Sequence, residues 1–149
     1  MTLFALLHKR LERKGPIRAG LIGAGKFGTM FLCQVPTTPG LRVSAIADLD
    51  PARARAQCRT AGWDEARIGG THFTDDGQAL ARGDDVEVVI EATGDPAAGI
   101  LHARAAIAAG KHVVMVNVEA DALAGPLLAA EAAAAGVVYS LAYGDQPAL

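Results

Sequence analysis

The chain has few of the residues that build disulfide or metal scaffolds. Its 149 residues include only two cysteines, Cys33 and Cys58, which form no C-x-x-C pair and have no histidine at metal-ligand spacing. A chain of this length makes one domain and buries roughly 68–70% of its unfolded surface, so it needs no disulfide or metal to hold a core. Isolated cysteines favour a reducing, cytoplasmic compartment.

The chain also lacks a charge excess and a long apolar run. Lys and Arg number 14 against 16 Asp and Glu, which gives a net charge of −2. This balance does not indicate a nucleic-acid partner, because no basic excess is available to meet phosphates. No stretch reaches the ~20 apolar residues that a membrane span requires, so no membrane partner is expected.

The N-terminal stretch "MTLFALLHKRLERKG" is not typical of a targeting segment. Its apolar run is too short for a signal-peptide core, and its basic residues follow that run instead of preceding it. Leu3, Leu7 and Leu11 recur at helical spacing. We therefore expect residues 1–15 to form a short amphipathic helix that docks on a domain made by residues 16–149.

Strands and helices are expected to alternate along the rest of the chain. Short apolar runs predict strands at 17–22, 41–47, 71–74, 86–91, 112–116 and 137–140. Helices are expected at 26–35, 52–60, 75–81, 96–109 and 120–135, with Gly125-Pro126 bending or restarting the last. This alternation predicts an α/β fold with a doubly wound parallel sheet, of the Rossmann type.

The stretch "GLIGAGKFGTMF" contains the pattern G-x-G-x-x-G at Gly23, Gly25 and Gly28. It follows a predicted strand and opens a predicted helix, as a dinucleotide-binding loop does. Unpaired amides of the first helical turn, at Lys26 and Phe27, would point at a pyrophosphate. The Lys26 side chain would assist that anion or face solvent. The alternative is an ordinary strand-to-helix turn with incidental glycines.

An acidic residue, Asp48, ends the second predicted strand twenty residues after Gly28. An acid at this place binds the adenosine ribose hydroxyls and favours NAD. The alternative is a solvated strand end, or a helix cap shared with Asp50. Arg53 and Arg55 open the next helix and would either meet the 2′-phosphate of NADP or form a solvated face. The choice between NAD and NADP therefore stays open.

The segment "EATGDP" lies at the carboxyl end of the fourth predicted strand. In this topology ligands bind in the crevice between the first and fourth strands, so Ala92, Thr93 and Gly94 are expected to line the cofactor site near the nicotinamide ribose. Asp95 is interpreted as a helix cap in preference to a catalytic acid. Asn117 follows the fifth strand and would either position the nicotinamide or substrate, or be a plain loop residue.

The four histidines, His8, His72, His102 and His112, are scattered and never spaced as i, i+4. We interpret them as surface or strand-end residues. The chain has no nucleophile elbow, no Walker motif and no zinc cluster. No metal site is expected, and no catalytic residue is assigned.

Taken together, the loop, Asp48, "EATGDP" and "KHVVMVNVEADAL" resemble the nucleotide-binding half of homoserine dehydrogenases over residues 17–149. "VNVEAD" and "YSLAYGDQPAL" are most similar to a bacterial branch that carries a SAF domain. This branch includes deoxyxylulose phosphate reductoisomerase-like proteins, which reduce and rearrange a sugar phosphate with NADPH. Homoserine dehydrogenases have an Asn-Lys pair after the fifth strand. Here Val118 follows Asn117, which disfavours homoserine as substrate.

The resemblance implies an NAD(P)-binding domain of an oxidoreductase that transfers hydride to or from a carbonyl or hydroxyl substrate, such as a sugar phosphate or an amino-acid-derived alcohol. In such relatives the chain continues into a substrate and oligomerisation domain, and residues 143–147 would form the joining loop. We expect a fragment that is inactive alone, with catalytic residues beyond Leu149 and a homo-oligomeric parent. The alternatives are a non-catalytic redox-sensing module and, less favoured, an S-adenosylmethionine site.

Overall fold

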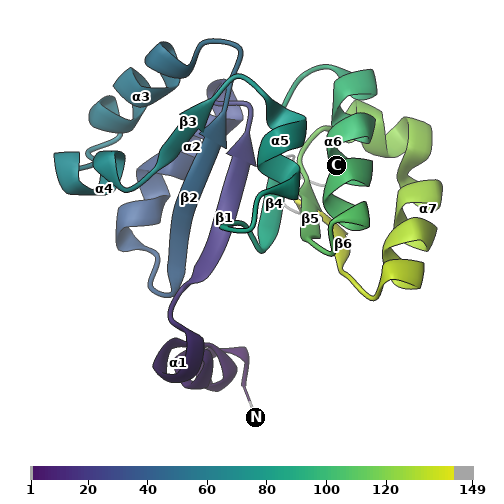
Figure 1. Cartoon of the computed structure of the whole chain (residues 1–149), viewed down its shortest axis with the longest axis horizontal. Coiled ribbons are helices and arrows are strands. Elements are labelled where there is room, and N and C mark those ends of the chain that lie inside the picture. Colours follow the sequence, from purple (N-terminus) through teal and green to yellow (C-terminus); the bar gives the residue numbers. More distant parts are fainter. Residues whose placement is uncertain (1, 143–149) are drawn as a thin grey trace, which may run out of the picture.

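Six parallel strands form one sheet in the order β3-β2-β1-β4-β5-β6 (Figure 1). The computed structural model describes residues 2–142. The strands are β1 (Ile17–Ile22), β2 (Leu41–Ala47), β3 (His72–Thr74), β4 (Val88–Glu91), β5 (His112–Met115) and β6 (Tyr139–Leu141). This doubly wound order confirms the predicted Rossmann fold.

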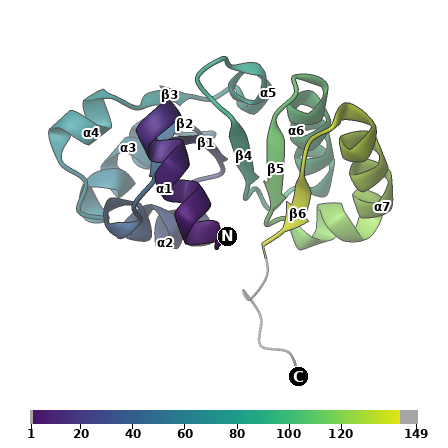
Figure 2. The same cartoon turned by 90° about the horizontal axis from the view of Figure 1, so that it is seen from below.

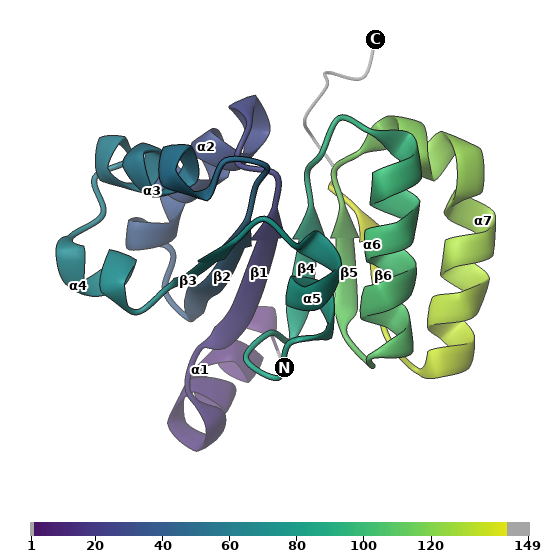
Figure 3. The same ribbon diagram turned by 45° about the horizontal axis from the view of Figure 1, so that its top comes forward.

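Helices cover both faces of the sheet (Figure 3). They are α1 (Leu3–Lys14), α2 (Lys26–Gln34), the 3-10 turn η1 (Val35–Thr37), α3 (Pro51–Thr60), α4 (Glu65–Gly69), α5 (Gly77–Arg82), α6 (Pro96–Ala108) and α7 (Val118–Ala135). The buried side chains form two apolar clusters, one under α2–α4 and the other under α5–α7. Strands buried on both faces explain why the sequence shows apolar runs without polar alternation.

Helix starts after the strands are set by side chains that accept the first free amides. The Asp50 carboxylate accepts the N–H of Arg53, and the Asp95 carboxylate accepts the N–H of Ala98. A proline stands at the first helical position after each of these caps. The interpretation of Asp95 as a helix cap is therefore confirmed.

Several bounds differ from the sequence-based expectation: β4 and β6 each begin two residues late, at Val88 and Tyr139, and α5 begins at Gly77 in place of residue 75. The α7 helix begins at Val118, two residues early, because the Asn117 side chain accepts the N–H of Ala120 and acts as its N-cap. The helix also runs unbroken through Pro126. Pro126 and Ala122, whose carbonyl loses its usual partner, both lie on the exposed side, where water can supply the missing hydrogen bond.

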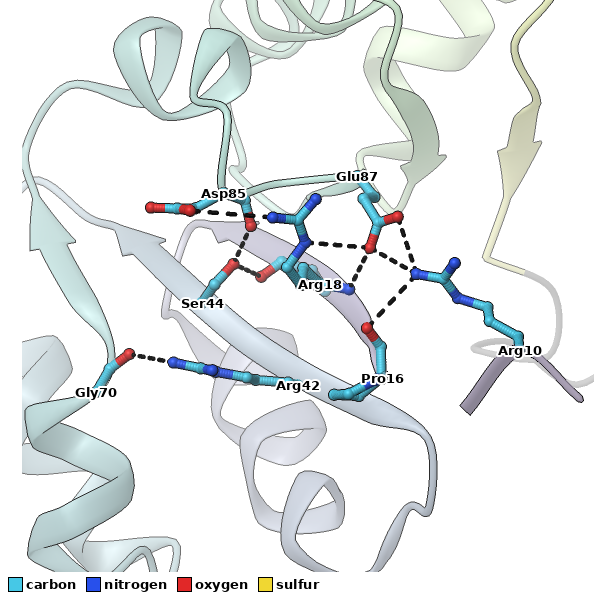
Figure 4. A network of polar contacts seen from close by, with 9 residues as sticks. Arg10, Pro16, Arg18, Arg42, Ser44, Gly70, Asp85 and Glu87 are labelled. Atoms are coloured by element: carbon cyan, nitrogen blue, oxygen red, sulfur yellow. Dashed lines mark hydrogen bonds and ion pairs between the residues drawn. The ribbon is translucent and has the colours of Figure 1, made fainter. Parts of the chain in front are cut away.

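The α1 helix lies at the amino end of the sheet, opposite the loops that follow the strands (Figures 1 and 2). Arg10 Nη2 donates to both carboxylate oxygens of Glu87 at 2.8 Å. The backbone N–H and Nε of Arg18 donate to the same carboxylate (Figure 4). Leu7 packs against Gly40, where an added Cβ would stand 2.7 Å from its Cδ1. No residue of α1 is fully buried.

The outer side of α7 is apolar and open to solvent. Leu123 is 71% exposed and Leu127 is 55% exposed. Among residues 2–142, no helix has both the length and the apolar character needed to cross a membrane.

Candidate functional site

A groove of about 410 Å³ opens at the carboxyl edge of the sheet, across the ends of β1, β2 and β4. We call it the groove. Six of the ten residues predicted to bind a cofactor line it: Gly23, Gly25, Asp48, Ala92, Thr93 and Gly94. The other four, Lys26, Phe27, Gly28 and Asn117, are not among its lining residues. The structure thus brings the glycine loop, the acid after β2 and the loop after β4 to one cavity.

Two glycines of the loop are required by the fold itself. Gly23 has a φ of +94°, and an added Cβ would stand 2.7 Å from the carbonyl oxygen of Ala92. A Cβ on Gly28 would collide with the carbonyl oxygen of Gly23. These positions let β1, the loop and α2 approach one another closely. Their glycines are explained without any ligand.

Gly25 has a different environment. Its φ is −74°, a value open to any residue, and a Cβ built there meets no atom within 4 Å. Gly25 is also the N-cap of α2 and supplies no side-chain acceptor for the first-turn amides. Every other α-helix among residues 2–142 begins with a side chain that accepts an amide; these caps are Thr2, Asp50, Asp64, Asp76, Asp95 and Asn117.

No protein group fills the space beside Gly25 or accepts the amides that face it, so this space suits an anion. The free amides of the first turn and the helix dipole both favour negative charge at this end of α2. The first turn of α2 contains no acidic residue that would repel an anion. The Lys26 side chain is exposed and does not line the groove. Phe27 is half-buried beside it.

Asp48 links the glycine loop to the helix after β2. Its Oδ2 accepts the Ala24 N–H at 2.9 Å, and its Oδ1 accepts the Asp50 N–H at 3.0 Å. Arg53 Nη2 donates to Oδ1 at 2.8 Å. The Asp48 side chain is only 6% exposed. Burial acts to raise its pKa, but the hydrogen bonds and the Arg53 charge outweigh it, and the pKa of Asp48 lies below its usual value.

The lowered pKa of Asp48 predicts an acid-sensitive contribution to stability. A carboxyl whose pKa is depressed in the folded state stabilises the fold above its unfolded pKa of about 3.9 and loses that contribution as the pH falls through the folded value. We expect wild type to lose more free energy of unfolding between pH 6 and pH 2.5 than Asp48→Asn. Urea unfolding at a series of pH values measures this. Parallel curves for the two proteins would contradict it.

The two arginines after β2 lie in different environments. Arg53 lines the groove beside Asp48. The Arg55 guanidinium instead stands over the ring of Phe73, 4.5 Å from its centroid. Of the two, Arg53 is therefore the arginine that faces the groove.

The loop after β4 is held by a buried polar network. The Thr93 hydroxyl donates to Glu91 Oε1 at 2.6 Å, and Asn117 Nδ2 donates to Thr93 Oγ1 at 3.3 Å and to the Asp95 carbonyl at 2.9 Å. Asn117 is 3% exposed. Because its amide is occupied by this loop and by the α7 cap, Asn117 fixes the groove wall from behind and does not reach into the groove.

His102 is not the surface residue that the sequence suggested. Its side chain is 14% exposed, lines the groove, and places Nδ1 3.2 Å from Glu91 Oε1. The fully buried Glu91 was not recognised either. No local sequence pattern signals this pair; two glycines make room for it, since an added Cβ would stand 2.6 Å from His102 Nε2 at Gly77 and 3.0 Å from Glu91 Oε2 at Gly99.

Within residues 2–142, no three His, Cys, Asp or Glu side chains gather closely enough to hold a metal ion. Burial raises the pKa of the Cys58 thiol to about 11, which keeps it protonated and unreactive near neutral pH. The site thus combines an uncapped helix start, a carboxylate at Asp48 and a polar wall after β4.

A family model described as "Oxidoreductase family, NAD-binding Rossmann fold" matches residues 17–116. Among curated proteins, no sequence matches the chain.

Solved structures share the fold over most of the chain. A homoserine dehydrogenase from Thiobacillus denitrificans is 27% identical, with a TM-score of 0.70 over 85% of this chain and 29% of its own. An NAD binding oxidoreductase from Klebsiella pneumoniae is 26% identical, with a TM-score of 0.65 over 85% and 34%. Biliverdin reductase from Synechocystis sp. PCC 6803, solved with biliverdin and NADP+, is 20% identical, with a TM-score of 0.66 over 85% and 37%. The chain spans about a third of the length of these proteins.

Proposed function

Because the chain belongs to the GFO/IDH/MocA oxidoreductase family, which has an NAD-binding Rossmann fold, we propose that the groove binds NAD or NADP through its pyrophosphate and adenosine ribose. One observation carries the assignment. The uncapped start of α2 at Gly25 opens onto empty space beside a buried carboxylate at Asp48. No other helix start among residues 2–142 combines these features.

Each part of the groove has a role in this proposal. The first-turn amides at Lys26 and Phe27 bind the pyrophosphate, and Gly25 leaves room for it. Asp48 accepts the ribose hydroxyls. Thr93 and Gly94 line the path toward the nicotinamide ribose, held in place by the network behind them. The family match favours this oxidoreductase function over the redox-sensing alternative.

In the parent protein the bound cofactor supplies hydride transfer at its nicotinamide C4. The chain's own contribution is to fix and orient that cofactor. We propose a carbonyl or hydroxyl substrate of the sugar-phosphate or amino-acid-derived class, supported by the 27% identity to a homoserine dehydrogenase. Val118 after Asn117, in place of a lysine, supports the SAF-domain branch over homoserine itself. No residue of the groove is assigned a proton-transfer step.

The apolar outer side of α7 supports a homo-oligomeric parent or a covering domain, since Leu123 and Leu127 are exposed on it. The proposed joining loop at 143–147 lies outside the described residues. Two isolated cysteines support the proposed cytoplasmic location.

Titration with NADH and NADPH, followed by nicotinamide fluorescence, tests the proposal. We expect saturable binding of at least one. Asp48→Ala should weaken NADH binding about tenfold, and NADPH binding less, because the carboxylate meets the ribose hydroxyls that only NADH presents intact. Arg53→Ala should weaken NADPH more than NADH, through loss of a charge-assisted bond to the 2′-phosphate.

Arg55→Ala is the matched control, because Arg55 begins the same helix but stacks on Phe73 away from the groove. It should leave both affinities within about twofold of wild type. Absence of saturable binding of either nucleotide at millimolar concentration would overturn the proposed function. An equal loss of both affinities in Asp48→Ala would overturn the ribose assignment alone.

A further inference from the structure

Glu91 is the one charged residue among residues 2–142 that is completely enclosed in the core. It is 0% exposed, and only one of its oxygens is used: Oε1 contacts Thr93 and His102, while Oε2 has no hydrogen-bond partner. Removing a carboxylate from water costs several kcal/mol, and an apolar residue of the same shape would often be as stable or more so. Stability of the fold therefore does not account for a glutamate at this place.

Both partners of Glu91 belong to the wall of the groove. Thr93 and His102 line the cavity, and Glu91 lies directly behind them at the end of β4. A carboxylate only accepts hydrogen bonds, so the network assigns the ring proton of His102 to Nδ1. When the ring carries only this proton, Nε2 is an acceptor. Within residues 2–142, Nε2 receives no hydrogen bond, and the ring packs closely against Gly77, where an added Cβ would stand 2.6 Å from Nε2.

The position of His102 in the groove matches the base of the dinucleotide. This step rests on the proposed function, in which the pyrophosphate lies at Gly25 and the ribose at Asp48. The remaining lining of the groove includes Leu49, Asp75, Gly77, Ala98 and His102. The adenine has to occupy that part, and its 6-amino group is a donor that needs an acceptor.

We propose that His102 recognises the adenine 6-amino group through Nε2, and that Glu91 is the positioning residue that holds the ring and its tautomer. Glu91 also holds Thr93, so one buried carboxylate sets both the base-binding and the ribose-binding parts of the wall. His102 touches the cofactor in this arrangement, whereas Glu91 acts through it.

The test compares NADH with reduced nicotinamide hypoxanthine dinucleotide, which has a carbonyl oxygen in place of the 6-amino group. Wild type should bind NADH about tenfold more tightly, because the analogue sets two acceptors against each other. His102→Phe keeps the ring volume but removes the acceptor, so the two nucleotides should bind within about twofold of each other. His72→Phe, at the exposed start of β3, is the matched control and should keep the wild-type ratio.

Variants of Glu91 separate positioning from simple support of the fold. Glu91→Gln keeps an oxygen that accepts from Nδ1 and should keep most of the discrimination. Glu91→Met fills the space without an acceptor and should lose it, even where thermal unfolding shows a folded protein. A loss of stability alone would lower both affinities and leave their ratio unchanged.

The outcomes distinguish the two proposals. If NADH binds but the analogue binds equally well, the proposed function stands and the inference on His102 is overturned. If discrimination persists in His102→Phe but is lost in Asp75→Ala, the acceptor is Asp75 and the inference is likewise overturned. If neither nucleotide binds, the proposed function fails and this inference fails with it.

Discussion

Gly28→Ala should lower the free energy of unfolding by about 3 kcal/mol or more, because its new Cβ would collide with a backbone atom that has no room to move. The clash is with the carbonyl oxygen of Gly23, and Gly23 is itself fixed at a φ of +94° against Ala92. Relief would require α2 to shift away from β1. Urea unfolding with an unchanged m-value measures the loss.

Gly69→Ala is the matched control for this measurement. Gly69 is the last residue of α4, and a Cβ there meets nothing within 4 Å. Its substitution should change stability by no more than about 0.5 kcal/mol. If Gly28→Ala lost less than about 1 kcal/mol, the close packing of α2 on the glycine loop would be refuted.

Gly25→Val should have the opposite effect: nucleotide binding is lost while the fold is kept. The extended backbone at Gly25 accepts a β-branched residue, and no protein atom lies within 4 Å of the new Cβ. Stability should change by at most about 1 kcal/mol, as for a poor N-cap. The side chain would, however, occupy the space proposed for the pyrophosphate.

Loss of two charge-assisted hydrogen bonds to the pyrophosphate corresponds to about 3–6 kcal/mol, so NADH and NADPH should each bind at least about a hundredfold more weakly. Calorimetric titration of both nucleotides measures this, with the unfolding midpoint as the check on folding. Wild-type affinity in a folded Gly25→Val protein would show that the nucleotide does not approach this helix end.

Much of the fold is predictable because its signals are local. β1 and β2 have the predicted bounds, and the Asp-Pro pairs at 50–51 and 95–96 start α3 and α6 as expected. The start of α7 is not predictable in this way, because the Asn117 side chain makes two different hydrogen bonds. Its oxygen accepts the Ala120 N–H as the helix cap, and its amide donates to the Asp95 carbonyl. The second contact joins residues 22 positions apart, which no local pattern records.

Some residues of the candidate site are likewise predictable from local sequence, and others are not. The glycine pattern and Asp48 lie in one strand-helix-strand unit, whose spacing is fixed, and they meet in the groove. The contact between Glu91 and His102 joins the end of β4 to the second turn of α6. His102 has no other histidine at helical spacing in the sequence, and this pattern predicts a surface residue. Only the three-dimensional contact shows that a buried carboxylate accompanies it.

The few contacts that hold α1 on the domain allow this helix to unfold locally. A 12-residue helix is marginal by itself in water, and this one is held mainly by the part-buried pair of Arg10 and Glu87 and by Leu7 against Gly40. It can therefore detach at a small fraction of the cost of global unfolding, as an independent opening unit. Because the groove lies at the other end of the strands, such fraying leaves the nucleotide cradle intact. Detachment of the N-terminal helix should therefore leave cofactor affinity unchanged.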